Sequence, residues 1–317
     1  MTGSFNKIDY RLRPAKHAER TMLIDLFKRM RFAPIESYQY VGFGSVAFVD
    51  YRMIHRALGI DDMISIEDVP EEDSDVRLRF ENNCPYQSID VRFGHSSVVL
   101  PTIDFTRRTL LWLDYDNALR RSMCNDLASV AQTITSGSFI GITVAGSFPS
   151  ESGPAQTALT HLKENFSEFV AHDAKIIDFA GKKYPKFVRD TLHDLVSRAF
   201  SDADAGRPVR RKARQVCNFK YRDGTVDMLT IGWVVVSDTE QAVFDSCNFA
   251  ALPFYRDGDQ AFNLKVPLVT PFEIREMERA LPDVSSSAAL TWIPEAERKA
   301  FAASYRFLPS FAPVEVI

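Results

Sequence analysis

The sequence SYQYVGFGSVAFVDYRMIHRALGIDDMISIED occupies residues 37–68 and decides the fold of this chain. Residues 38–41 are rich in aromatic and β-branched side chains and predict a short strand, which the turn Gly42-Phe43-Gly44 follows at once. Ser45 opens a predicted helix that runs to about Leu58, and Gly59 is placed to end it in the left-handed conformation. The letters MISI then predict a second buried strand, after which Glu67 is the first acid.

This layout of strand, glycine turn, helix, strand and acid is typical of a nucleotide-cofactor site. Glycines let a backbone turn sharply and approach a ligand, and an acid at the end of the second strand can accept both hydroxyls of an adenosine ribose. Gly42, Gly44 and Ala47 also satisfy the GxGxxA variant of the dinucleotide fingerprint, with Glu67 near the expected distance. The glycine turn alone leaves both kinds of site open.

The later strands decide the fold class. Residues 88–101 predict a third strand and its loop, residues 109–117 a hydrophobic fourth strand that ends in carboxylates, and residues 139–147 a fifth strand. Near the far end, ARQVCNFKY and VDMLTIGWVVV flank Asp223-Gly224, which is a β-hairpin signal. We therefore predict an α/β protein with a doubly wound, Rossmann-like sheet that closes with an antiparallel hairpin.

Residues 37–236 resemble the class I methyltransferases that use S-adenosyl-L-methionine, whose sheet ends in such a hairpin, rather than the all-parallel dehydrogenase sheet. The segments YVGFGS, MISIE and LDYD are most similar to those of bacterial O-methyltransferases whose substrates are unassigned. One position departs from the superfamily, which usually has an acid two positions before the first glycine, where Tyr40 stands here. The amino group of the cofactor's methionine part must then find another partner.

The resemblance implies S-adenosyl-L-methionine as the cofactor and places its contacts in three loops. The glycine turn, the end of the second strand and the loop after the third strand supply the cofactor-binding residues Gly42, Phe43, Gly44, Ser45, Glu67, Asp68, His95 and Ser96. The assignment of His95 and Ser96 to the adenine ring rests on position alone. A lone histidine is more often structural than catalytic.

Asp114 and Asp116 are the catalytic candidates, because the carboxyl end of the fourth strand faces the crevice of such a sheet. A carboxylate there could orient an oxygen or nitrogen acceptor and take its proton. The Tyr115 ring could pack beside the methyl group and contact the substrate. The alternative is that Asp116 or Asn117 caps a helix that begins near Ala118.

The segment before the first strand predicts a helix that begins near Pro14. Its buried stripe consists of Leu23, Leu26, Phe27 and Met30. Lys16 and Arg20 extend this stripe instead of opposing it, so both bases need a partner. With Arg13 and His17 they predict an anion site for the substrate above the crevice. The alternative is that Glu19 and other acids neutralise them at the edge of the core.

The net charge of −4 conceals two runs of opposite sign. Residues 61–75 hold eight acids and no base, whereas residues Arg207 to Arg222 hold seven bases and no acid. The acidic run suits a cationic sulfonium cofactor. The basic run could bind an anionic small molecule or a nucleic acid, or it could be a solvated turn paired with the acidic run.

Length and composition fit a single methyltransferase-like domain over residues 1–317. We divide it into an N-terminal helical cap (1–36), a Rossmann-like core (37–250) with an insertion (148–208), and a C-terminal helical extension (251–317). A capping box at Thr270 to Glu273 predicts one helix of this extension. Neither a signal peptide nor a membrane span is evident, so the expected location is the cytoplasm without membrane contact.

The four cysteines form no CxxC pair, and the fifth strand ends in Ala145-Gly146-Ser147 instead of the acid and amide that an oxygen-rich metal site needs. We therefore expect reduced thiols and no metal. The leading hypothesis is methyl transfer to oxygen or nitrogen of an anionic substrate. A subunit that keeps the fold without turnover and a nicotinamide-dependent oxidoreductase are the alternatives.

Overall fold

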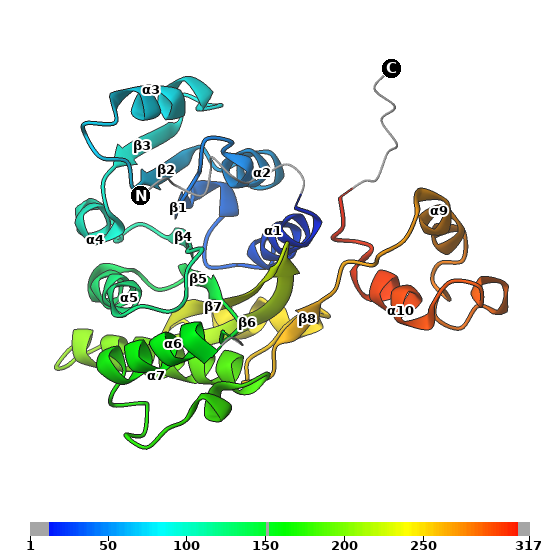
Figure 1. Ribbon diagram of the computed structural model, residues 1–317. Coiled ribbons are helices and arrows are strands. Elements are labelled where there is room, and N and C mark those ends of the chain that lie inside the picture. The colour runs from blue at the N-terminus through cyan, green and yellow to red at the C-terminus, as the bar shows by residue number, and fades with distance from the viewer. Residues whose placement is uncertain (1–12, 150–151, 310–317) are drawn as a thin grey trace.

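The computed structural model describes residues 13–149 and 152–309, which form a layered α/β protein around one eight-stranded sheet (Figure 1). The strand order is β3-β2-β1-β4-β5-β7-β6-β8. The first five strands are parallel, β7 is antiparallel to both β5 and β6, and β8 runs parallel to β6. The strands are β1 (Gln39–Gly42), β2 (Asp62–Glu67), β3 (Ile89–Phe93), β4 (Thr109–Asp114), β5 (Phe139–Ala145), β6 (Arg211–Asp223), β7 (Val226–Ser237) and β8 (Phe262–Leu264).

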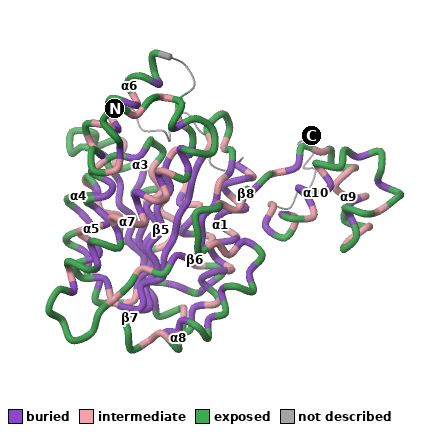
Figure 2. The backbone as a smooth tube through the Cα atoms, turned by 90° about the horizontal axis from the view of Figure 1, so that it is seen from below, coloured by how far each residue is buried: buried purple, intermediate pink, exposed green. Residues whose placement is uncertain are grey.

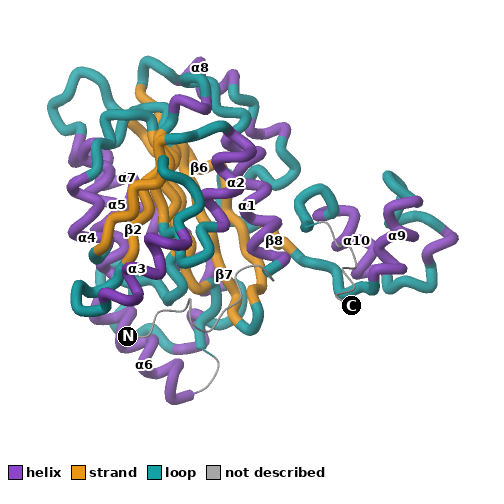
Figure 3. The backbone as a smooth tube through the Cα atoms, turned by 90° about the horizontal axis from the view of Figure 1, so that it is seen from above, coloured by secondary structure: helices purple, strands orange, loops and turns teal. Residues whose placement is uncertain are grey.

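Helices cover both faces of the sheet, as Figure 3 shows, with α1 and α2 on one side and α4, α5 and α7 on the other. The predicted doubly wound sheet with its antiparallel hairpin is therefore confirmed. The helices are α1 (Pro14–Phe27), α2 (Val49–Leu58), α3 (Ser74–Asn83), α4 (Ser96–Val99), α5 (Arg121–Thr133), α6 (Ser152–Asn165), α7 (Lys183–Ala203), α8 (Gln241–Ser246), α9 (Pro271–Arg279) and α10 (Glu295–Ser304).

Alternation along the strands divides the core into two hydrophobic clusters, one on each face. In β4, Leu110 and Trp112 belong to the cluster under α1 and α2, whereas Leu111 and Leu113 belong to the cluster under α4, α5 and α7. Side chains of a strand point to alternate faces, so a strand that is buried on both sides is hydrophobic throughout. Figure 2 shows the result as a buried sheet inside a shell of exposed loops and helix faces.

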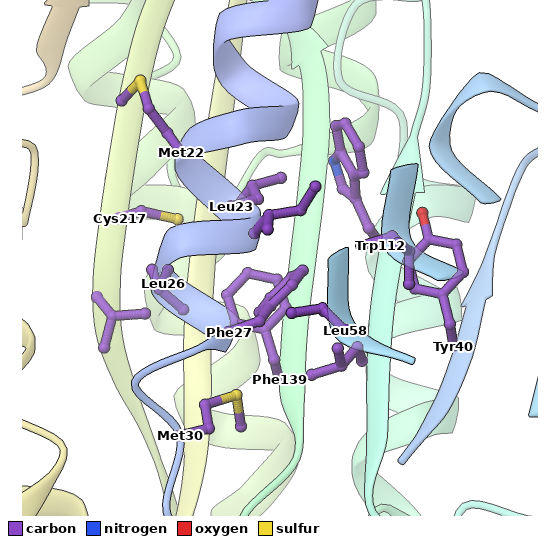
Figure 4. Close-up of a cluster of buried hydrophobic side chains, with 14 of the residues drawn as sticks. Met22, Leu23, Leu26, Phe27, Met30, Tyr40, Leu58, Trp112, Phe139 and Cys217 are labelled. Carbon is purple, nitrogen blue, oxygen red and sulfur yellow. The ribbon is translucent and has the colours of Figure 1, made fainter. Parts of the chain in front are cut away.

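Helix α1 is fixed to the sheet by the predicted apolar stripe. Leu26 and Phe27 are fully buried, and Phe27 meets Phe139 of β5 edge to face, with ring centroids 4.9 Å apart (Figure 4). Burial of a side chain of this size contributes about 1.5–3 kcal/mol. The predicted start at Pro14 is confirmed.

The glycine turn differs from the prediction in one respect, because α2 begins at Val49 and not at Ser45. Ser45 and Phe48 have positive φ angles of 53° and 47°, so residues 45–48 form an irregular turn before the helix. Gly59 ends α2 in the left-handed conformation as predicted, with φ of 69°. Four residues of loop therefore separate the glycine turn from the helix N-terminus.

Two further helix predictions can be compared with the structure. Helix α5 begins at Arg121, so the expectation of a helix start near Ala118, capped by Asp116 or Asn117, is wrong. The residues between β4 and α5 form an irregular loop instead. Within the predicted insertion, the two helical stretches are present as α6 and α7, and α7 packs against α5 and β6 as part of the cover of the sheet.

The C-terminal segment forms a small hydrophobic cluster of its own, and Figures 1 and 2 show α9 and α10 set apart from the sheet. Its capping box is confirmed, since Thr270 Oγ1 accepts a hydrogen bond from Glu273 N and Glu273 Oε2 accepts one from Thr270 N. Phe307 returns to the main core against Phe254, with ring centroids 5.4 Å apart. The parts of the cap and of the extension at residues 1–12 and 310–317 lie outside the described residues.

Two global features follow from the described ranges 13–149 and 152–309. None of their helices is both long enough and apolar enough to cross a membrane. The four cysteines are all free thiols, as expected from their spacing.

The packing around Gly44 generates the first prediction. A Cβ built on Gly44 would lie 2.5 Å from Ser65 Oγ and 2.8 Å from the Phe48 ring. Gly44→Ala should therefore destabilise the fold by about 1–3 kcal/mol through overpacking, measured by urea unfolding. Gly153→Ala is the matched control, because nothing lies within 4 Å of its added Cβ and the position is helical.

The control should leave the free energy of unfolding unchanged or raise it by up to about 1 kcal/mol. Equal stability of the Gly44 and Gly153 variants would show that the turn has room for a side chain. Such room would favour the expectation that Gly44 provides space for a ligand.

Candidate active site

A cavity of about 650 Å³ opens at the carboxyl ends of β1, β2, β3 and β4. In a doubly wound sheet the crevice lies where neighbouring strands lead to opposite faces, here between β1 and β4. Of the residues predicted for the site, those that line this cavity are Arg20, Phe43, Gly44, Ser45, Glu67, Asp68, His95, Ser96, Asp114, Tyr115 and Asp116. Gly42, Arg13, Lys16 and His17 do not line it.

Glu67 ties the end of β2 to the glycine turn. Its Oε1 accepts hydrogen bonds from Gly44 N at 2.8 Å and from Ser65 Oγ at 2.7 Å. From the other side, the Tyr51 hydroxyl lies 2.9 Å from the carbonyl oxygen of Gly42 and 2.7 Å from that of Ile64. The turn is therefore held in shape by the protein itself, and the Glu67 carboxyl at the cavity wall forms part of that support.

The environment of Glu67 favours its protonated form. Burial raises the pKa of its carboxyl to about 7, although the Ser65 hydroxyl and the N–H groups of Gly44 and Ser45 oppose this shift. Removing a carboxylate from water disfavours the charged form, and a few hydrogen bonds compensate only in part. A cationic ligand in the cavity would favour the carboxylate again.

Polar groups also meet on the side of the cavity formed by α4 and α5. Ser96 Oγ and the Tyr115 hydroxyl each donate to Asp126 Oδ2 at 2.6 Å. Burial and the Asp126 carboxylate raise the pKa of the Tyr115 phenol, so it stays a hydrogen-bond donor. The Tyr115 ring meets Phe43 edge to face, with centroids 5.1 Å apart. This side of the cavity therefore has fixed aromatic walls.

His95 has a local structural role in addition to lining the cavity. Its Nδ1 accepts a hydrogen bond from Ser97 N at 3.3 Å and caps α4. The predicted contact of His95 with an adenine ring is not tested by this geometry and stays a prediction.

Asp114 stands at the carboxyl end of β4, as predicted, and is held by a buried lysine. Lys16 Nζ lies 2.5 Å from Asp114 Oδ1 and 2.8 Å from Glu19 Oε2, and both Lys16 and Glu19 are fully buried. Burial opposes the charge on Lys16, but Asp114 and Glu19 outweigh it and raise its pKa. The Tyr221 hydroxyl donates to Glu19 at 2.8 Å, which joins β6 to the same group of charges.

The other predicted bases on α1 also have acidic partners. Arg20 pairs with Asp50 of α2, and Arg13 pairs with Asp223 at the end of β6. The alternative that acids neutralise these bases is therefore the one the structure shows. His17 is half-buried, and burial lowers the pKa of its imidazole, so it does not supply a cation near neutral pH. Only Arg20 of this group reaches the cavity wall.

Sequence reasoning missed two buried acids of the site, Asp50 and Asp126. Each had a detectable signal, because each lies on the inward stripe of its helix. Asp50 is four residues before Ile54, and Asp126 is four residues before Val130, and both of these apolar side chains are buried. A charge on such a stripe needs a partner or a ligand.

The basic run at 207–222 belongs mostly to strand β6. Within the described residues its ion pairs are local, with Asp204 for Arg207 and Arg211, Asp238 for Lys212 and Asp227 for Lys220. Pairing with the acidic run is therefore wrong. Binding of an anionic small molecule or nucleic acid to this strand stays a prediction. The described residues also contain no group of three or more side chains arranged to hold a metal ion.

Residues 8–316 match the model of a protein family described as "Putative O-methyltransferase". The chain therefore belongs to this methyltransferase family, in agreement with the fold and with the resemblance found in its sequence. No curated protein matches the chain.

The solved structures to which the chain is similar include three with a bound cofactor or SAH. An O-methyltransferase from Bacillus cereus in complex with SAH has 12% identity and a TM-score of 0.36, over 72% of this chain and 84% of that chain. Cofactor-bound Rv0187 from MTB has 12% identity and a TM-score of 0.35, over 72% and 81%. Trm1 from Pyrococcus horikoshii with S-adenosyl-L-methionine has 8% identity and a TM-score of 0.44, over 74% and 58%.

The raised pKa of Glu67 generates a pH prediction. The folded protein binds this proton more tightly than the unfolded chain, whose carboxyl has a pKa of 4.5, so ionisation destabilises the fold as pH rises towards 7. Glu67→Gln removes the titration. As pH rises from about 5 to about 8, wild type should lose up to about 3 kcal/mol in its free energy of unfolding that this variant keeps, measured by urea unfolding.

Glu81→Gln, at an exposed position of α3, is the control and should follow the wild-type profile across this range. If the Glu67→Gln profile also runs parallel to wild type, the carboxyl titrates in the folded protein as it does in the unfolded chain.

The pairing of Lys16 generates a prediction about stability. Lys16→Met would leave Glu19 and Asp114 without their cation, so we expect a loss of about 3–5 kcal/mol in the free energy of unfolding. Adding Glu19→Gln should recover part of it. Lys28→Met, at a half-exposed position next to α1, should cost about 0.5 kcal/mol or less. Similar losses for the two lysine variants would contradict this account.

Proposed function

We propose that this protein is an S-adenosyl-L-methionine-dependent methyltransferase that acts on oxygen or nitrogen of its substrate. The observation that carries the proposal is the cavity itself. It lies at the crevice between β1 and β4, and its walls combine the glycine turn, the acid that ends β2 and the carboxylates that follow β4. Membership of the "Putative O-methyltransferase" family supports oxygen as the acceptor atom.

The cavity suits this cofactor in size and charge. Its volume of about 650 Å³ falls in the range of about 300–1,000 Å³ that is usual for ligand pockets. Carboxyl groups outnumber bases along its walls, where Arg20 and Arg120 face Asp50, Glu67, Asp68, Asp114, Asp116 and Asp126. A surplus of acids favours a ligand with a sulfonium charge.

The residues take roles according to their position. Glu67 and Asp68, at the end of β2, would hold the ribose, whereas His95 and Ser96 would contact the adenine. The bound cofactor supplies an electrophilic methyl group. Asp114 would orient the acceptor and take its proton, and Lys16 would hold Asp114 in place through their ion pair. Asp116 is exposed at the mouth of the cavity, where it could contact the substrate.

The alternatives are weaker but testable. An oxidoreductase would share the glycine turn and Glu67, but the antiparallel β7 between β5 and β6 is opposed to the all-parallel dehydrogenase sheet. A binding protein or assembly subunit would keep the cavity without turnover, and Tyr40 in place of the usual acid favours that alternative.

Calorimetric titration tests the cofactor class. We expect S-adenosyl-L-methionine and S-adenosylhomocysteine to bind and NAD and NADP not to bind. Glu67→Ala should weaken binding of both adenosyl ligands by about 1–3 kcal/mol, because a charged partner of the ligand and the support of Gly44 are lost together. Binding of a nicotinamide cofactor in place of the adenosyl ligands would contradict the proposal.

Transfer of a radiolabelled methyl group from the cofactor to a metabolite extract tests turnover. Asp114→Asn keeps the size of the side chain but cannot take a proton, so transfer should fall about 10²-fold or more while cofactor affinity changes far less. Cofactor binding with no transfer to any fraction in wild type would favour the subunit without turnover.

A further inference from the structure

The pair formed by Arg20 and Asp50 has no role in the chemistry described above. We propose that it is the subsite for the amino-acid half of the cofactor, with Arg20 binding the carboxylate and Asp50 the ammonium group. This inference rests on the proposed function and extends it to residues from two helices, α1 and the first turn of α2.

The position of the pair supports a ligand contact. Arg20 and Asp50 are each at least nine-tenths buried, yet both line the cavity, next to the turn of Phe43, Gly44 and Ser45. A buried ion pair seldom stabilises a fold more than apolar side chains of the same size would, because both charges lose their hydration. A buried pair at the wall of a ligand cavity is better explained by recognition of a charged ligand.

The geometry of the pair leaves hydrogen-bonding groups for that ligand. Within the described parts of the chain, the hydrogen bond of the Arg20 side chain runs from Nε to Asp50 Oδ1. A guanidinium carries further N–H donors on Nη1 and Nη2, in a planar fork that matches a carboxylate, and a carboxylate accepts several hydrogen bonds. Arg20 and Asp50 can therefore keep their mutual hydrogen bond and also bind a ligand in the cavity.

A zwitterion is the ligand chemistry that such a pair fits. The carboxylate of the ligand would pair with the Arg20 guanidinium and its ammonium group with the Asp50 carboxylate, so the four charges would alternate in sign. Asp50 outweighs the effect of burial and raises the pKa of Arg20, which therefore stays charged. A simple anion would meet Asp50 as a like charge, and a simple cation would meet Arg20.

Neighbouring side chains are less able than Asp50 to bind the ammonium group of the ligand. Asp114 also lies near, but its carboxylate already contacts Lys16 at 2.5 Å, and Lys16 itself is shared with Glu19. Tyr40, where an acid would usually stand, is buried and packs edge to face on Tyr51, with centroids 5.0 Å apart. Asp50, the residue before Tyr51, therefore places a carboxylate at the start of α2 instead of in β1.

The first test dissects the ligand and leaves the protein unchanged. Wild-type protein is titrated with S-adenosylhomocysteine, with its decarboxylated analogue and with 5′-methylthioadenosine, which lacks the whole amino-acid part. Loss of the carboxylate alone should weaken binding at least about tenfold, and loss of both charges should weaken it further. Equal affinity for all three ligands would overturn the inference while leaving the cofactor class intact.

The second test assigns the effect to the pair. The double variant Arg20→Gln with Asp50→Asn keeps hydrogen-bonding side chains and removes both charges together, so no unpaired charge stays buried. We expect its affinity for S-adenosylhomocysteine to fall about tenfold or more, with affinity for 5′-methylthioadenosine unchanged. Lys220→Gln with Asp227→Asn, a pair on the hairpin that does not line the cavity, should leave both affinities unchanged.

Equal weakening towards both ligands in the Arg20 and Asp50 variant would overturn the assignment. If this variant fails to fold, as judged by thermal unfolding, the wild-type ligand series decides. Wild-type protein that binds none of the three adenosyl ligands would overturn the proposed function, and this inference with it.

Discussion

The buried ammonium group of Lys16 joins the N-terminal helix to the sheet at the point where the site is built. Its contact with Asp114 links α1 to β4, and Glu19, also on α1, extends the same network to β6 through the Tyr221 hydroxyl. A charge in such a place must be paired, because an unpaired one costs several kcal/mol. The position of α1, and with it Arg20 at the cavity wall, therefore depends on these ion pairs as well as on the apolar stripe of the helix.

The glycine turn shows the same dependence of the site on its support. Gly44 is hydrogen-bonded by Glu67 and has Ser65 and Phe48 where a side chain would be. The acid that the sequence assigns to a ribose is thus also the clamp that shapes the turn. Binding and folding share this group, so its substitution will affect both, and matched controls are needed to separate them.

Much of the fold could be predicted because its signals are local. Gly59 ends α2, the Asp223-Gly224 signal marks the hairpin, and alternation and length mark the buried strands. The start of α2 was missed, since Ser45 and Phe48 adopt positive φ angles that their residue types do not suggest. Strand β8 was missed too, because its three residues pair with β6 through contacts distant in sequence.

The sequence by itself determined the order of elements, the two-faced sheet and the loops that line the crevice, because periodicity and glycine turns act over a few residues. It also indicated that Lys16 and Arg20 point inward. Glu19, on the same helix, could be named as a partner from the sequence, but only the tertiary structure decided the others, since Asp114 and Asp50 come from other elements of the chain. A charge pattern shows that a buried base needs an acid, but which acid comes close depends on how helices pack on the sheet.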